Sequence, residues 1–228
     1  MTKLTNGFIV NFFQDRGEYF GVVGAIANGL STILSLLIHS LIDSSFTIAL
    51  HPVSDLGTGP EISRIIYNVG LITISFFQYP LFLSVRNYLH KKEGNAFLIK
   101  IATLSALIST ISHNILSLVP FERNILDLYL IHGSAAAIHY VGGSIALVFY
   151  GFIEILTSKV SKILVTISLL AGALYGILWM GYLFYFIVGI PPELINHSVQ
   201  WFALASVLIW SLLHSLFIIR AKKQDFEA

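Results

Sequence analysis

The sequence predicts an all-α membrane protein of six transmembrane helices, and two observations lead to that class. The chain has 228 residues, of which 56% are hydrophobic and 11% carry a charge, whereas globular proteins carry charge on about a quarter of their residues. The hydrophobic residues form several runs longer than about 18 residues, the length that crosses a bilayer as a helix. We therefore expect one transmembrane helical-bundle domain that covers residues 1–228.

The expected helices are separated by short polar connections that contain the glycine and proline typical of turns. Residues 1–19 combine phenylalanines with charges, which is compatible with an interfacial helix or with a short lead-in to the first span. Pro80 predicts a kink late in the second span, and residues 220–228 predict a charged cytoplasmic tail. The six expected spans are residues 20–42, 62–85, 97–119, 131–156, 163–188 and 196–219.

Small and aromatic residues indicate how these spans are used. The first span begins with several glycines and alanines, and the fourth opens with Gly133, Ser134 and three alanines. Such faces allow close approach of a neighbouring helix or of a flat ligand. The fifth span is rich in tyrosine and tryptophan, including Tyr175 and Tyr182, and we expect this band to face lipid and the membrane interface.

The distribution of lysine and arginine predicts the orientation. An even number of spans places both termini on one side, and cytoplasmic connections carry an excess of these residues. The expected terminal side holds Lys3, Arg16, Arg86, Lys91, Lys92, Lys100, Lys159, Lys162, Arg220, Lys222 and Lys223, against Arg64 and Arg123 on the other. We therefore expect a multi-pass protein of the cell membrane with both termini in the cytoplasm.

Composition also excludes some classes of function. The net charge of +1 gives no nucleic-acid-binding surface. The chain has no cysteine, which excludes disulfides, thiolate metal sites and thiol nucleophiles.

Histidines and carboxylates gather at the expected outer ends of the spans. His113, His132 and His139 lie at the facing ends of the third and fourth spans, and His197 opens the sixth. His132 and His139 are seven residues apart, about 10 Å along one helix face, so they could not both bind one metal ion without distortion. His113 could pair with either. Ionisable groups at membrane depth indicate a functional site by default.

We predict His113, His132, His139 and His197 as metal ligands, with Asp55 and Glu193 as acid–base residues. Imidazole with carboxylate suits zinc, and imidazole alone also suits copper or haem iron. The spacing matches no standard metal motif. Histidines at helix ends also commonly hydrogen-bond to their neighbours, and we expect His214 to pack within the bundle.

Short motifs in the chain resemble a known family. The segment Val53-Ser54-Asp55-Leu56-Gly57 follows the first span, and Asn68-Val69-Gly70-Leu71-Ile72 lies early in the second. Val119-Pro120-Phe121 ends the third span, and His132 leads the fourth. The pattern resembles the prokaryotic family labelled domain of unknown function 998, six-span membrane proteins common in archaea. The resemblance implies the six-span fold, no agreed activity, and special positions at Ser54, Asp55, Gly57, Asn68 and His132.

Three functions are compatible with this pattern. The first is an outward-facing histidine and carboxylate site that binds a lipid headgroup or acts on it with a metal such as zinc. The second is an accessory or haem-binding electron-transfer subunit of a larger membrane complex, with protein partners. The third is a transporter, which we rank lowest because the central depths of the spans hold hydroxyls but almost no charges.

Overall fold

The computed structural model describes the chain except for residues 1, 120–125, 158–159, 190–192 and 228, and it leaves out some further side chains near these gaps. The described part is helical, and six of its helices are long and apolar enough to cross a membrane. This confirms the predicted fold class. The elements are α1 (Thr2–Ile42), the short 3₁₀ helix η1 (Val53–Gly57), α2 (Glu61–Lys91), α3 (Ala96–Leu118), α4 (Leu126–Leu156), α5 (Lys162–Val188) and α6 (Glu193–Glu227).

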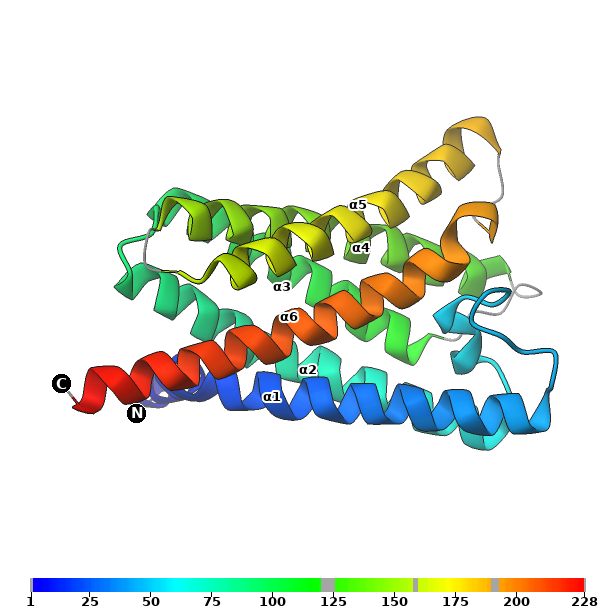
Figure 1. Cartoon of the computed structure of the whole chain (residues 1–228), viewed down its shortest axis with the longest axis horizontal. Helices are drawn as coiled ribbons and strands as arrows, with labels where there is room; N and C mark the ends of the chain where they lie inside the picture. Colours follow the sequence, from blue (N-terminus) through cyan, green and yellow to red (C-terminus); the bar gives the residue numbers. More distant parts are fainter. Residues whose placement is uncertain (1, 120–125, 158–159, 190–192, 228) are drawn as a thin grey trace.

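The six helices alternate in direction and form a closed ring. Each helix packs against the next in the chain, and α6 packs against both α5 and α1. Both termini lie at one end of the bundle (Figure 1), which we call the terminal end; the opposite end, where η1 lies, is the distal end. The ring brings the distal ends of all six helices around one axis.

The first and last helices are longer than the sequence predicted. Residues 2–19 are the beginning of α1, and α6 continues to Glu227. Lys222 explains part of this difference, because its Nζ lies 2.9 Å from both carboxylate oxygens of the buried Glu18. Gly17 lets α1 approach α2, since a Cβ there would collide with the carbonyl oxygen of Pro80. α2 passes through Pro80 and ends only at Lys91.

The two halves of the bundle are packed differently. The terminal half holds the large hydrophobic core, which includes Phe82, Tyr150 and Trp210. At the distal end, the connection between α1 and α2 folds back onto the bundle and buries Leu56 against Phe46 and other neighbours. The space between this cover and the terminal core is not filled, and the candidate site lies there.

Candidate functional site: a polar cavity in the distal half

A cavity of about 660 Å³ occupies the distal half of the ring. All six helices and η1 contribute to its walls. On α6 it extends from His197 to Leu208, so it spans about 16 Å along that helix. Its volume lies in the range of pockets that bind drug-sized ligands.

All four predicted metal-ligand histidines reach this cavity. His113, His132, His139 and His197 line it, although they come from three different helices. The rings of His113 and His139 are in contact, with centroids 4.6 Å apart and planes inclined by 35°. The antiparallel pairing of α3 with α4 explains this meeting, because it puts the end of one helix beside the beginning of the next.

Hydrogen bonds hold His139 in one orientation. Its Nδ1 lies 3.0 Å from the carbonyl oxygen of Ser109 and 2.9 Å from the Ser109 hydroxyl. Because a carbonyl oxygen only accepts, Nδ1 carries the hydrogen and donates. Nε2 then accepts from the hydroxyl of Tyr175, 3.2 Å away. Both ring nitrogens of His139 are therefore engaged by protein groups.

The other histidines differ in their partners. His132 donates from Nδ1 to the carbonyl oxygen of Val119 at 2.8 Å. The Nδ1 atom of His113 is buried and has no hydrogen-bond partner among the described residues. That atom has almost no accessible surface, so the ring of His113 does not present Nδ1 to the cavity.

These positions do not fit the predicted metal site. A zinc ion needs ligand nitrogens about 2.0–2.1 Å away and directed at one point. The rings of His113 and His139 instead overlap, and the Nε2 of His139 is taken by Tyr175. In the part of the chain that the structure describes, no three histidine or carboxylate side chains are grouped to hold a metal. The close ring contact also leaves no space for a haem plane between these two histidines.

Of the two predicted acid–base residues, the structure describes the side chain of Asp55 alone. The carboxylate of Asp55 lies 3.2 Å from Nδ1 of His51, one turn earlier in the connection. Its neighbours Ser54 and Gly57 line the cavity, and no carboxylate does so among the described lining residues. Glu193 begins α6, and its side chain is outside the part that the structure describes.

Apart from Asn68, a position that the family resemblance singled out, the sequence did not indicate which aromatic and amide side chains complete the site. Tyr67, Tyr140, Tyr175 and Tyr182 line the cavity, and Tyr175 is only 6% exposed. The expectation that the band on the fifth span faces lipid is therefore wrong for Tyr175. The seven-residue spacing of Tyr175 and Tyr182, two turns on one face, is the signal that could have identified them.

Four carboxamides join these groups and add uncharged donors and acceptors to the cavity lining. They are the side chains of Asn28, Asn68, Gln78 and Gln200. Arg64, exposed in the first turns of α2, adds a positive charge at the rim.

No protein-family model, curated protein or solved structure matches the chain.

Proposed function

We propose that the protein binds an amphipathic molecule of the membrane, with its oxygen-rich headgroup and the first part of its apolar chain inside the distal cavity. The observation that carries this proposal is that the cavity is lined by both polar and apolar side chains. Leu71, Ile74, Leu116 and Val207 supply apolar surface beside the imidazoles, phenols and carboxamides. A ligand that satisfies both kinds of lining has a polar head and a hydrocarbon body.

The charges at the cavity favour a headgroup that accepts hydrogen bonds. Arg64 is a fixed cation with five N–H donors, which suits phosphate or carboxylate oxygens, and tyrosine hydroxyls and carboxamides add neutral donors. With no carboxylate among the described lining residues, nothing there repels an anionic head. The volume of about 660 Å³ accommodates a headgroup and a few carbons of chain, and the remaining chain would lie in the bilayer.

We place the cavity on the extracytoplasmic side of the cell membrane, because the excess of lysine and arginine favours cytoplasmic termini. We propose binding and no reaction step. Asp55 is engaged by His51, and the histidines do not form a metal-ligand set.

Gly133 provides a direct test. It lines the cavity, and a Cβ built there meets no atom within 4 Å. Gly133→Leu should therefore fold normally and fill part of the cavity. The matched control is Ile138→Leu on the same helix, where the side chain is 47% exposed on the outside of the bundle.

The measurement is mass spectrometry of lipids that remain with the protein after purification in mild detergent. We expect a defined lipid class with the unmodified protein and with Ile138→Leu, and at least a tenfold loss with Gly133→Leu. Equal retention by all three proteins would overturn the proposal, since the lipid would then be bound on the outer surface.

A further inference from the structure

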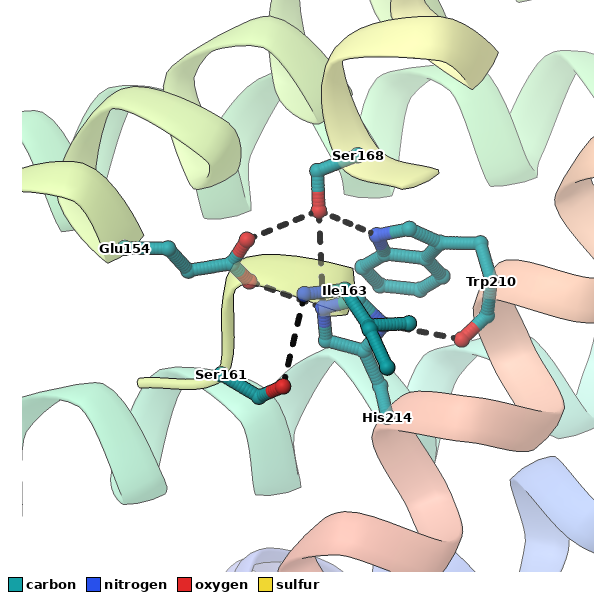
Figure 2. A network of polar contacts seen from close by, with 6 residues as sticks. All are labelled: Glu154, Ser161, Ile163, Ser168, Trp210 and His214. Carbon is teal, nitrogen blue, oxygen red and sulfur yellow. Dashed lines mark hydrogen bonds and ion pairs between the residues drawn. The ribbon is translucent and has the colours of Figure 1, made fainter. Parts of the chain in front are cut away.

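A second buried polar site lies in the terminal half, and its residues do not line the cavity; Figure 2 shows its contacts. Glu154 of α4, Ser168 of α5, and Trp210 and His214 of α6 form it, and none of them is more than 3% exposed. The site therefore connects three helices within the membrane-spanning part of the bundle. Carboxylate and imidazole groups at such depth indicate function by default.

The hydrogen-bond directions in this site require one proton between Glu154 and His214. Nδ1 of His214 lies 2.9 Å from the carbonyl oxygen of Trp210, so Nδ1 must donate. Nε2 lies 2.7 Å from Oε1 of Glu154. Two lone pairs would repel at that distance, so a proton lies between these atoms. The pair is then neutral as a whole.

The surroundings favour the charged form of the pair, an imidazolium beside a carboxylate. The indole of Trp210 is stacked on the ring of His214, with centroids 4.3 Å apart, within the range of cation–π attraction. The hydroxyl of Ser168 accepts from the indole N–H at 2.9 Å and donates to Oε2 of Glu154 at 2.9 Å. Donors therefore approach both carboxylate oxygens.

Trp210 links this pair to an aromatic cluster of the terminal core. The rings of Phe82, Tyr150 and Trp210 lie 5.6–6.2 Å apart, and along their helices they lie between the cavity and the terminal end. On α6 the cavity ends at Leu208, about 3 Å before Trp210 along the helix axis. The backbone carbonyl, the indole N–H and the ring face of Trp210 all contact the Glu154–His214–Ser168 group, so opening the pair removes contacts that hold Trp210 in this cluster.

We propose that Glu154 and His214 form a proton-binding latch, which keeps the aromatic cluster of Phe82, Tyr150 and Trp210 packed on the terminal side of the cavity while the pair contains its single proton. This role goes beyond ligand binding in the distal cavity and does not depend on which ligand the cavity takes. The ligand of the new site is a proton supplied by water at the terminal end.

The proton count predicts how the latch responds to pH. In water, a histidine loses its extra proton above about pH 6.5 and a glutamate gains one below about pH 4.3. An opened pair therefore carries no proton at alkaline pH and two at acidic pH, whereas the closed pair carries one. Between these values the two states bind equally many protons. Above about pH 6.5 and below about pH 4.3, each further pH unit therefore shifts the equilibrium between the closed and the opened pair toward the opened pair by up to tenfold.

Other ionisable groups on the neighbouring helices have partners of their own or are exposed. Tyr150, one turn before Glu154, and Arg86 of α2 interact electrostatically with each other. Lys222 of α6 is paired with Glu18 of α1. Lys100 of α3 and Lys162 of α5 are exposed.

Because the sequence contains no cysteine, a maleimide labels only the cysteine that is introduced. Ser215→Cys places one thiol on the residue that follows His214, at a position that is 0% exposed and faces Gly21 of α1, so its labelling reports opening of α6 from its neighbours. The protein is reconstituted in nanodiscs and labelled with a charged maleimide over a pH series. Gly133→Cys, in the cavity, is labelled in parallel, and the ratio of the two rates removes the pH dependence of the thiol itself.

We expect the labelling rate of Ser215→Cys, divided by that of Gly133→Cys, to be lowest near pH 5–6. Above about pH 6.5 this ratio should rise severalfold per pH unit. The double variant Glu154→Gln/His214→Gln is an amide pair that keeps hydrogen bonds without the shared proton. It should abolish the rise of the labelling ratio at alkaline pH. Glu18→Gln should leave that rise intact. A flat ratio in the parent, or a rise that survives in the amide pair, overturns the proposal. If the amide pair does not fold, nitrogen-15 NMR of labelled histidines decides: the latch requires one imidazole that keeps both protons at pH 8 and loses this state in Glu154→Gln.

Discussion

The Glu154–His214 pair allows a quantitative prediction of stability. Replacing either residue alone by leucine leaves the other buried without its partner, since both are 3% exposed. Stranding one member of a buried ion pair costs about 3–5 kcal/mol. Replacing both by leucine removes both charges and strands mainly the Ser168 hydroxyl, which costs about 1–3 kcal/mol.

The free energies of unfolding of the parent, the two single variants and the double variant give a coupling energy. The values predict that the double variant loses much less stability than the sum of the single losses, with a coupling of more than about 2 kcal/mol. An ordinary hydrogen bond between membrane helices contributes about 0.6 kcal/mol and at most about 1.7 kcal/mol. The coupling therefore distinguishes an ion pair from a neutral contact.

The assay is reversible unfolding in mixed micelles, followed by tryptophan fluorescence and circular dichroism. Glu61→Leu serves as the control, because Glu61 is exposed in the first turn of α2. We expect the control to change stability by less than about 0.5 kcal/mol. Single losses that add up in the double variant would refute the reasoning, because the two side chains would then contribute independently.

Three further predictions concern the cavity and the topology. Gly133→Ala should change the free energy of unfolding by less than about 0.5 kcal/mol, because a Cβ there meets no atom within 4 Å. Gly143→Ala should cost about 1–3 kcal/mol, because a Cβ at Gly143 comes within 2.5 Å of the buried Tyr175 ring. The same unfolding assay compares the two variants, and equal losses of stability would contradict the presence of open space at Gly133. Tyr175→Phe removes the donor to Nε2 of His139 and should cost about 1 kcal/mol, with no loss if that hydrogen bond is not formed. In intact cells, an impermeant thiol reagent should label Ala49→Cys at the exposed distal connection and should not label Lys91→Cys at the exposed terminal connection; the opposite result would invert the orientation.

The fold could be predicted from the sequence because membrane crossing imposes a length on each apolar run. Helix ends were less predictable at the termini. Glu18 was placed before the first span, yet it is buried because Lys222, more than two hundred residues later, pairs with it. Such a partner carries no signal in the local composition, so a charge near a helix end was interpreted as a boundary.

The candidate site was predictable only in part. Hairpin topology was enough to bring His113, His132 and His139 to the same end of the bundle. It did not determine ring directions, and these decide that His113 and His139 overlap instead of converging on a metal. Nor did it show that α5 turns Tyr175 inward to the Nε2 of His139. Side-chain direction depends on the rotation of each helix about its axis, which packing sets and apolar run length does not.

The position of the charges also bears on the transporter that the sequence ranked lowest. That ranking depended on the scarcity of charges at the central depths of the spans. Glu18 and Glu154 are buried, but both lie toward the terminal ends of their spans, Asn11–Ile42 and Leu126–Leu156. Each contacts a side chain of α6, Lys222 or His214, so one helix carries both partners and also forms part of the cavity wall. These charges therefore leave the transporter ranked lowest, and the labelling of Ser215→Cys measures whether α6 moves.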